Sequence, residues 1–347
     1  MKTLPLISIV VPTYNSEETL PKVLDSIQKQ TYPSRRVEVL VIDGGSTDGT
    51  LKIAQKYKAK VLFNKKQHQV YAKYIGQMKA KGKYIMHLDS DEVMEYRKSI
   101  EVKINTFLQH ENVKAIVPSG HKTPSGVSAV NRIINDFGDP FSYYMYGFSF
   151  NSNFFIKQLK SKFKTVFENR EVVIIDFQKS KHIPGIEMSA TGMVIDREYL
   201  FKTFPQVKKY PRLISQTFFL YVERGTHVGF TKNDPIIHYS ASSWMKYLKK
   251  IKSRILNNVY MTEMGKSAFS GRTQYYSNSF AIKKLLFIPY SVTFLLPLTV
   301  GINLSISRKS IVFLSYPFLC FYISCLVLYY SFLKSIGRTP QIKGYGI

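Results

Sequence analysis

Short apolar segments alternate with amphipathic ones through about the first 120 residues of the chain. Five of them are short and rich in apolar or β-branched residues, which is typical of buried strands: Leu6–Pro12, Val37–Asp43, Lys60–Phe63, Lys83–Leu88 and Val113–Pro118. Between them lie three longer stretches with helical character: Glu17–Lys29, Thr47–Tyr57 and His68–Ala80. This alternation predicts an α/β fold in which helices cover both faces of a mostly parallel central sheet.

Two long apolar segments follow towards the other end of the sequence. Leu285–Leu304 and Ile311–Leu333 contain no charged side chain, and each has about the 20 residues that a membrane-spanning helix needs. Lysines and arginines flank the pair on both outer sides, whereas the connector holds only Arg308 and Lys309. The positive-inside rule therefore predicts a transmembrane hairpin with both ends in the cytoplasm. The alternative is a pair of buried core helices, and two prolines make the first segment the weaker candidate.

The stretch 241–284, directly before these segments, is strongly basic. Within Ser242–Met264, apolar and aromatic residues such as Trp244, Tyr247 and Ile251 recur at helical spacing with lysines between them. This pattern predicts an amphipathic helix that lies on an anionic membrane surface. The alternative is a helix packed on the N-terminal domain with its basic face in solvent.

Charge and cysteine content narrow the class of protein. Among 347 residues, 49 Lys and Arg stand against 23 Asp and Glu, for a net charge of +26. Such an excess attracts polyanions, but it is concentrated beside the apolar segments and no nucleic-acid motif is evident, so we expect anionic lipid and no nucleic acid as a partner. Cys320 and Cys325 both lie in the second apolar segment, which disfavours a disulfide framework. The opening residues predict a buried strand rather than a signal peptide.

Polar residues gather where three of the predicted strands end. The first strand ends in "PTYN", the second in "DGGSTDGT" and the strand Lys83–Leu88 in "DSDE". In parallel sheets, ligands bind at the carboxyl ends of the strands. Gly44 and Gly45 allow a sharp turn and close approach of the backbone to a ligand, and Asp43 can accept hydrogen bonds from a base or ribose. No Gly-x-Gly-x-x-Gly or Walker loop is present, which disfavours a dinucleotide-dependent oxidoreductase.

The acidic turn Asp89-Ser90-Asp91 predicts a metal site. Like charges this close repel each other unless a cation lies between them, and carboxylate oxygens suit Mg²⁺ or Mn²⁺. Such an ion bridges diphosphate oxygens and stabilises charge on a nucleoside-diphosphate leaving group. An isolated Asp-x-Asp is often only a solvated loop, but its place after a buried strand, beside two other polar strand ends, favours the metal.

These motifs resemble a known family. "VVPTYNSEETLPKVLDSIQKQTYP", "EVLVIDGGSTDGT" and "GKYIMHLDSDE" are similar in order and spacing to the family 2 glycosyltransferases, which have the GT-A fold. The similarity is specific over residues 4 to about 118 and continues more weakly through "SATGMVIDREYLF" and "GFTKNDPIIHY". It implies transfer of a sugar from a nucleotide-sugar donor, UDP- or GDP-linked, to an acceptor, usually with inversion.

The resemblance also implies roles for individual residues. The positions that would contact the nucleoside are Pro12, Thr13, Tyr14 and Asp43, with Gly44 beside them. Asp89 and Ser90 would lie by the ribose and diphosphate, and Asp91 would ligate the metal and serve catalysis. Asp89 and His238 are the further candidate metal ligands, although a lone His in an apolar strand is more often a core residue.

The general base does not follow from the resemblance. Related enzymes carry an acidic pair where this sequence has Ser215 and Gln216, and a glutamine cannot take a proton at neutral pH. The candidate carboxylates are Glu187, Asp196 and Glu223. A lipid phosphate acceptor, which is already ionised, would need no strong base.

The predicted organisation combines these features. Residues 1–240 would form the GT-A domain, with 119–188 as a variable insert on the acceptor side. This insert is rich in aromatic residues and then in lysine, and would meet the bilayer. It would be followed by the basic segment 241–284, two transmembrane helices in 285–334 and a short cytoplasmic tail, 335–347. We expect a metal-dependent glycosyltransferase at the cytoplasmic face of the cell membrane that acts on a lipid-linked or glycan acceptor. The alternative is a degenerate, non-catalytic relative that binds nucleotide-sugar or tethers partners at the membrane.

Overall fold

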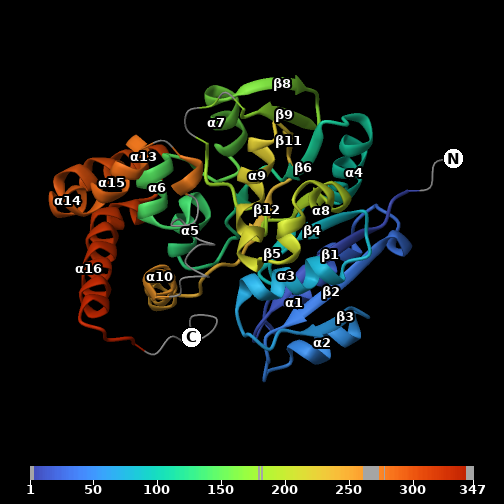
Figure 1. The fold of residues 1–347 in the computed structure, drawn as a ribbon, viewed down its shortest axis with the longest axis horizontal. Coiled ribbons are helices and arrows are strands. Elements are labelled where there is room, and N and C mark those ends of the chain that lie inside the picture. The colour runs from blue at the N-terminus through green and yellow to red at the C-terminus, as the bar shows by residue number, and fades with distance from the viewer. Residues whose placement is uncertain (1–3, 179, 181–182, 261–272, 277, 341–347) are drawn as a thin grey trace. The chain divides into compact units, whose positions relative to one another are not determined.

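A computed structural model describes residues 4–178, 180, 183–260, 273–276 and 278–340, and the chain divides into two compact units (Figure 1). The sheet unit comprises Met1–Lys122, Asn151–Ser180 and Ile186–Tyr239. The helical unit comprises Thr123–Phe150, Lys181–Gly185 and Ser240–Ile347. The predicted insert 119–188 is thus divided between the two units. Parts of the predicted basic segment (261–272 and 277) and tail (341–347) lie outside the described residues.

The strands and helices predicted for the first part of the chain are confirmed. The observed strands are β1 (Ile7–Thr13), β2 (Val37–Asp43), β3 (Lys60–Phe63), β4 (Tyr84–His87) and β6 (Val113–Val117). The helices between them are α1 (Leu20–Gln28), α2 (Thr50–Lys56), α3 (Gln69–Lys79) and α4 (Ser99–Gln109), with a 3-10 turn, η1, at Ser34–Arg36. The ends of the predicted elements differ from the predicted bounds by a few residues, and α4 and η1 were not predicted.

The central sheet has nine strands in the order β3-β2-β1-β4-β10-β6-β11-β9-β8. The strands not yet introduced are β8 (Lys164–Glu168), β9 (Val172–Asp176), β10 (Met193–Asp196) and β11 (His227–Thr231). Strands β3, β2, β1 and β4 are parallel neighbours, but β10 runs antiparallel between β4 and β6, and β9 is antiparallel to both β11 and β8. Because β6 runs in the direction of β4 and is parallel to β11, seven of the nine strands share one direction. The prediction of a mostly parallel sheet is therefore confirmed, although β9 and β10 run against it and make the sheet mixed. Strands β9 and β10 do not follow the strand–helix alternation that favours parallel pairing.

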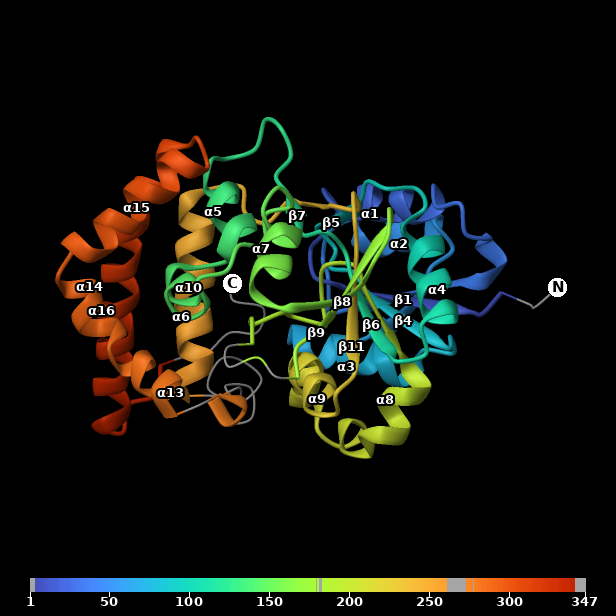
Figure 2. The same ribbon diagram turned by 90° about the horizontal axis from the view of Figure 1, so that it is seen from above.

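Alternate residues of β1 face opposite layers of helices, as the two-residue period of a strand requires. Ile7, Ile9 and Val11 belong to a buried cluster that includes residues of α1 and α4. Val10 faces α3, so closely that a Cβ added to Gly76 would lie 2.2 Å from its Cγ1. Figure 2 shows α1, α2 and α4 on one side of the sheet and α3, α8 (Arg197–Thr203) and α9 (Thr217–Glu223) on the other. The predicted cover on both faces is confirmed.

A second, three-stranded sheet in the order β5-β12-β7 lies beyond the end of β4. It is made of β5 (Glu92–Met94), β7 (His121–Lys122) and β12 (Ile236–His238). The turn before β12 is held by Asp234, whose buried carboxylate pairs with the buried ammonium of Lys103 and accepts a hydrogen bond from Thr231 Oγ1 at 2.6 Å. The remaining elements of the sheet unit are α7 (Phe155–Lys162), η2 (Pro205–Lys208) and η3 (Pro211–Gln216).

The helical unit contains both apolar segments. Its elements are α5 (Val130–Phe137), α6 (Pro140–Tyr146), α10 (Trp244–Tyr260), η4 (Thr273–Tyr275), α13 (Asn278–Leu285), α14 (Phe287–Val292), α15 (Leu295–Ser307), η5 (Ile311–Ser315) and α16 (Tyr316–Ser335). Ile311–Ser335 is one helical stretch, 25 residues long, which is long and apolar enough to cross a membrane by length and composition alone. The first predicted span is not one helix, because the chain bends by 91° between Asn278–Val292 and Leu295–Ser307. The bend includes Phe294 in the left-handed region, at φ 53°.

The apolar face of α10 is covered by protein. Tyr247, Ile251, Ile255 and Leu256 are buried in one cluster with residues of α5 and α16. The prediction that this face rests on a membrane is therefore wrong, and the packing partner is the helical unit rather than the N-terminal domain. Aromatic residues of α6 join the same cluster, so much of the aromatic part of the predicted insert is core. In both cases, apolar side chains expected at a membrane are buried against other parts of the chain, which removes them from water equally well.

Candidate functional site

The ends of β1 and β2 are joined by hydrogen bonds around Asp43. Thr13 and Asp43 are paired in register, and Thr13 Oγ1 donates to Asp43 Oδ1 at 3.1 Å. The amides of Gly45 and Ser46 donate to Oδ2 at 2.8 and 2.9 Å, and the Ser46 hydroxyl donates to Oδ1 at 2.5 Å. Each oxygen of this buried carboxylate thus accepts two hydrogen bonds. Asp43 fixes the shape of the loop that follows β2, and its predicted contact with a base or ribose stays a prediction.

The loop after β1 is tied to the loop after β2 and to the acidic turn. Asn15 accepts a hydrogen bond from the Thr47 amide at 2.9 Å, and the Ser16 amide donates to Thr50 Oγ1 at 2.7 Å. The hydroxyls of Ser16 and Ser90 lie 2.9 Å apart. The three polar strand ends therefore form one continuous surface, as predicted.

The predicted nucleoside-contacting residues lie along this surface. Pro12 is buried at the end of β1, and Tyr14 follows it half-buried. The Gly44 amide donates to the Thr13 carbonyl at 2.9 Å, which holds the second loop against the first. The structure therefore brings these predicted residues together at one edge of the sheet.

Asp89 is paired with a lysine that the sequence-based prediction did not include. Lys73, from α3, lies with Nζ 2.9 Å from Asp89 Oδ1, and Gln69 Nε2 donates to Oδ2 at 2.9 Å. Lys73 and Gln69 are four residues apart on α3 and so share one face of the helix. That spacing was visible in the sequence, but which face turns to the acidic turn depends on how α3 packs on β1.

The charge of Lys73 balances several carboxylates. Its side chain is 6% exposed. Burial by itself would lower the pKa of Lys73, but the carboxylates of Asp89 and Glu187 outweigh burial and raise the pKa above its usual value. Lys73 therefore stays charged and offsets the repulsion between the carboxylates of the acidic turn. From the sequence alone, a metal ion is the only cation predicted for this role.

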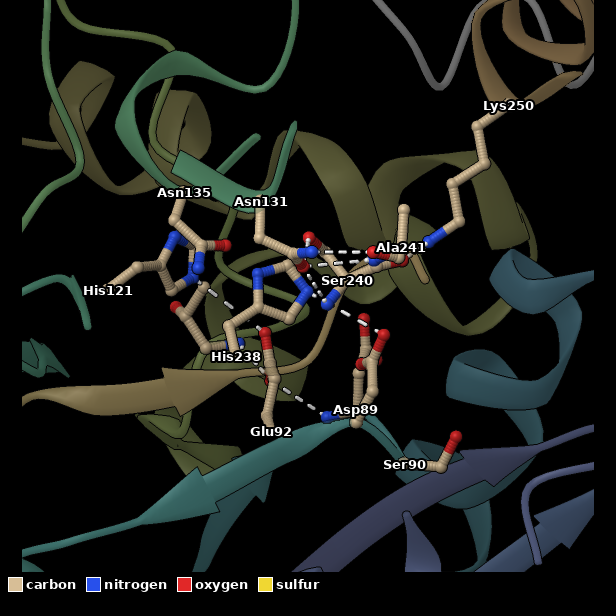
Figure 3. Close-up of polar contacts among 12 residues, drawn as sticks. Asp89, Ser90, Glu92, His121, Asn131, Asn135, His238, Ser240, Ala241 and Lys250 are labelled. Carbon is tan, nitrogen blue, oxygen red and sulfur yellow. Dashed lines mark hydrogen bonds and ion pairs between the residues drawn. The ribbon is translucent and has the colours of Figure 1, made fainter. Parts of the chain in front are cut away.

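Glu92 connects the acidic turn to the loop before β10, which contains Thr191. Its Oε2 accepts the Asp89 amide at 2.8 Å and the Thr191 amide at 2.7 Å. Burial, together with the negative charge of Asp89, raises the pKa of Glu92 to about 8. His121 Nε2 lies 3.9 Å from Glu92 Oε1. Figure 3 shows Glu92, Asp89 and the rings of His121 and His238 gathered at this point.

His238 is brought to Asp91 by the small sheet. The pairing of β12 with β5 sets His238 opposite Glu92, and the Tyr239 amide donates to the Asp91 carbonyl at 2.9 Å. As a result His238 Nε2 lies 3.7 Å from Asp91 Oδ2. The sequence motif suggested this pair, but only the β12–β5 register explains it.

The pair Asp91 and His238 fits a divalent cation. An ion with ligands at about 2.1 Å places neighbouring ligand atoms about 3 Å apart, so a small closure would let both side chains contact one ion. Asp89 is less suited as a ligand, because Lys73 and Gln69 engage its carboxylate. Within the described parts of the chain, no three His, Cys, Asp or Glu residues are grouped so as to hold a metal. A metal here would therefore need oxygen ligands from diphosphate or water, as is usual for Mg²⁺.

The three candidate bases lie in different places. Asp196 is paired in register with Tyr84, at the start of β4 and so at the opposite edge of the sheet. Glu223 is exposed at the end of α9, just before β11 begins at the same far edge. Only Glu187 lies in the loop next to the site, where Ser189 donates to its Oε1 and its charge acts on Lys73. Ser215 and Gln216 are buried in η3.

Comparison with known proteins identifies the N-terminal half of the chain. Residues 8–176 match the family model Glycosyl transferase family 2, which agrees with the resemblance seen in the sequence motifs. The glycosyltransferase AglE of Haloferax volcanii is 37% identical over 95 residues, which are 26% of this chain and 31% of that protein. The dolichyl N-acetyl-alpha-D-glucosaminyl phosphate 3-beta-D-2,3-diacetamido-2,3-dideoxy-beta-D-glucuronosyltransferase of Methanococcus voltae is 37% identical over 87 residues, which are 23% of this chain and 27% of that protein. The chain thus spans less than a third of the length of either relative.

A solved structure extends the similarity of fold. The mannosyltransferase PcManGT of Pyrobaculum calidifontis, in complex with GDP-Man and Mn²⁺, superimposes with a TM-score of 0.55 at 14% identity, covering 94% of this chain and 88% of that one. At this identity the likeness concerns the fold alone. It confirms a mixed α/β fold of the GT-A type around a central sheet.

Proposed function

We propose that this chain, whose residues 8–176 form a glycosyl transferase family 2 domain, transfers a sugar from a UDP- or GDP-linked donor to a lipid-linked or glycan acceptor. The observation that carries the proposal is the acidic turn at the carboxyl end of β4. There Asp91 faces His238 at 3.7 Å, while Lys73 lies against Asp89 at 2.9 Å. This combination of a metal-binding pair and a buried cation suits a diphosphate.

The loops after β1 and β2 would hold the nucleoside. Tyr14 is half-buried beside Thr13, and the Asp43-centred loop offers a rigid wall whose shape does not depend on the ligand. Asp89 and Ser90 would face the ribose and diphosphate. Asp91 and His238 would hold Mg²⁺ or Mn²⁺, which when bound stabilises negative charge on the departing diphosphate.

Glu187 is the proposed general base. In the transfer, an acceptor hydroxyl oxygen bonds to the anomeric carbon, the bond from that carbon to the diphosphate oxygen breaks, and the hydroxyl proton passes to the Glu187 carboxylate. Attack from the side opposite the diphosphate gives inversion. Lys73, which feels the charges of both Asp89 and Glu187, would keep the two carboxylates compatible within one site.

A membrane location and a lipid-linked acceptor belong to the same proposal. The long apolar stretch Ile311–Ser335 and the net charge of +26 support attachment to an anionic membrane on its cytoplasmic face. The relative from Methanococcus voltae, by its name, acts on a dolichyl-phosphate-linked sugar, which supports an acceptor carried on a lipid phosphate.

The test is a transfer and hydrolysis assay with a panel of UDP- and GDP-sugars in the presence of Mn²⁺. The wild-type chain should release nucleoside diphosphate from at least one donor, and Asp91→Asn should lower the rate by about 10²-fold or more, since it removes a metal-binding charge. Glu111→Gln, an exposed acid on the same unit, serves as the matched control. Activity that is unaffected by chelator and by Asp91→Asn would rule out the assigned site.

The second candidate is a non-catalytic relative that only binds nucleotide-sugar. The specific observation in its favour is the buried pair Ser215 and Gln216 where related enzymes have acids. Donor binding by calorimetry without turnover of any donor, in protein that keeps the Asp91-dependent metal response, would favour this candidate over the enzyme.

A further inference from the structure

We propose that the helical unit attaches to the membrane through one leaflet only, as a monotopic element, and that neither apolar segment crosses the bilayer. Its partner is a lipid surface with anionic headgroups. This inference does not depend on the sugar-transfer reaction.

Exposed apolar side chains are concentrated in one part of the chain. Among the described residues, 16 of the 24 exposed large apolar side chains lie between positions 282 and 336. The most exposed of them are Leu285 at 72%, Leu295 at 70%, Ile306 at 72%, Ile311 at 84% and Phe318 at 65%. Single exposed apolar residues are ordinary, but a concentration of this size marks an interaction surface. We call it the apolar face of residues 282–336.

Helix α16 exposes one side and buries the other. Phe318, Phe321 and Phe332 are at least half exposed, whereas Cys320 and Ile323 are buried. The buried side packs in one cluster with α10 and α5. A single helix that spans a bilayer would contact lipid on all sides. The buried side of α16 instead packs against protein.

Helix α10 accompanies α16 and cannot itself enter the hydrocarbon. Tyr260 Oη donates to the Tyr330 carbonyl at 3.0 Å, and Lys334 donates to the Val259 carbonyl. The first eleven residues of helix α10 carry five cations: Lys246, Lys249, Lys250, Lys252 and Arg254. Placing these five charges at the centre of a bilayer would cost more than about 10 kcal/mol in total, at about 2.5–3.5 kcal/mol each. Since α10 must remain at the surface, α16 remains there with it.

The connector between the apolar segments returns to the starting side. Arg308 Nε lies 2.8 Å from Asp136 Oδ2, and the Asp136 carboxylate is fully buried. Asp136 belongs to α5, which precedes both apolar segments in sequence. If Leu285–Leu304 crossed the bilayer, Arg308 would lie about 30 Å from α5 on the opposite side. The ion pair therefore requires that this segment enter and leave by the same face, in agreement with its 91° bend.

Positive charge favours lipid over a second copy as the occupant of the apolar face. Lys284, Lys309 and Lys334 border the apolar residues along the sequence, and two chains of charge +26 would repel each other at such a contact. Anionic headgroups meet the same lysines favourably, by about 1 kcal/mol for each cation near the surface.

Cysteine labelling distinguishes attachment to one leaflet from a hairpin that spans the bilayer. The full chain carries Cys320→Ala and Cys325→Ala, and a single cysteine is placed at exposed Lys309 in the connector or, as control, at exposed Lys249 on α10. In inverted membrane vesicles, a membrane-impermeant maleimide should label both positions to the same extent without detergent. A hairpin that spans the membrane would leave the Lys309→Cys variant unlabelled until detergent is added, while Lys249→Cys is labelled at once, and that result would overturn the proposal.

A second experiment tests the face itself. Phe318→Asp should weaken co-sedimentation of the full chain with vesicles of phosphatidylcholine and phosphatidylglycerol by about tenfold or more, because a large apolar group no longer enters the leaflet. Leu108→Asp, at a similarly exposed position of the sheet unit (53% exposed), should bind like wild type. Equal binding of all three proteins, or a lipid-free dimer that Phe318→Asp converts to monomer, would contradict the proposal. Donor turnover in detergent should be unchanged in Phe318→Asp, which separates this test from that of the proposed function.

Discussion

At the scale of single residues, the candidate site is an arrangement of charges around one buried lysine. Lys73 contacts Asp89 directly and feels the charge of Glu187. Glu92 holds the Asp89 and Thr191 amides from the other side. The proposed binding of a diphosphate depends on this buried cation, which must keep its place among the carboxylates. We therefore expect Lys73 to matter both for stability and for binding.

Lys73→Met should lower the free energy of unfolding by about 3 kcal/mol, because it leaves a buried carboxylate without its partner. It should also weaken donor binding by about tenfold or more, measured by calorimetry with UDP- and GDP-sugars. Lys73→Arg should restore part of both effects. Lys79→Met, at an exposed position of the same helix, is the control. If Lys73→Met and Lys79→Met bind donor equally, Lys73 has no role in the site.

We expect the stability of the fold to depend on pH because the imidazole of His87 is buried. Burial, and secondarily the charge of Lys73, lower the pKa of His87 from 6.5 to about 3, and neither ring nitrogen has a hydrogen-bond partner among the described residues. Below pH 6.5 the unfolded chain binds a proton that the folded chain does not, so stability is full above this pH and falls as the pH drops towards 3. Between pH 7 and pH 5 the loss should be about 2 kcal/mol.

Urea unfolding of wild type and His87→Gln at both pH values tests this dependence. The difference in unfolding free energy between the two proteins should shift by about 2 kcal/mol in favour of the variant at pH 5. His110→Gln, at the end of α4, controls for loss of a histidine as such. Parallel pH profiles of wild type and His87→Gln would show that folding does not lower the pKa of His87.

At the scale of elements, two placements create the site. Helix α3 approaches β1 closely at Gly76, and this close contact brings Lys73 to the end of β4. Strand β12 is positioned by the turn at Asp234, which accepts hydrogen bonds from Thr231 and Ser99 and pairs with Lys103. Because β12 carries His238, the Lys103–Asp234 pair supports the proposed metal-binding pair, Asp91 and His238, from a distance.

Lys103→Met should therefore destabilise the protein by about 3–5 kcal/mol, since both partners of the pair are completely buried and Asp234 would keep an uncompensated charge. In whatever fraction remains folded, Mn²⁺ affinity should fall, as His238 loses its fixed position. Lys98→Met, exposed at the start of the same helix, should change stability by less than about 0.5 kcal/mol. Chemical denaturation and Mn²⁺ titration measure the two effects, and a Lys103→Met protein as stable as Lys98→Met would show that the pair is dispensable.

At the scale of the whole molecule, charge and apolar surface act together. The chain carries a net charge of +26, and the apolar face of residues 282–336 lies in the helical unit. Electrostatic attraction is screened by salt, whereas insertion of apolar groups is not. Membrane binding should consequently have one salt-sensitive and one salt-resistant component.

Binding of the full chain to vesicles containing phosphatidylglycerol should weaken by about tenfold or more between 0.1 and 0.5 M NaCl, as the Debye length shortens. Binding that remains at high salt should be lost in Phe318→Asp, and binding at low salt should fall when the vesicles contain only phosphatidylcholine. Vesicle flotation over a salt series measures both components. Binding that is independent of salt and equal on neutral and anionic vesicles would show that electrostatic attraction does not contribute to it.

The sequence by itself determined the local elements and the chemistry at their ends. Strands β1 and β2 and helix α1 lie where apolar periodicity predicted them, because the period of buried positions is a local property. The meeting of "PTYN", "DGGSTDGT" and "DSDE" at one edge also followed, since parallel strands of one sheet bring their carboxyl ends together. The acidic turn itself could be read from the sequence, whereas His238 was suggested only by the resemblance, and its place beside Asp91 depends on the antiparallel pairing of β12 with β5.

Only the tertiary structure decided what depends on contacts between distant segments. The choice of Lys73 as partner of Asp89 rests on the packing of α3 against β1, and the remoteness of Asp196 and Glu223 from the site rests on strand register. Composition alone could not distinguish a membrane-spanning hairpin from helices that return to one side. The ion pair of Arg308 with Asp136 supports the second arrangement, which we propose. It joins residues far apart in the sequence, and hydrophobicity along the chain carries no information on such a contact.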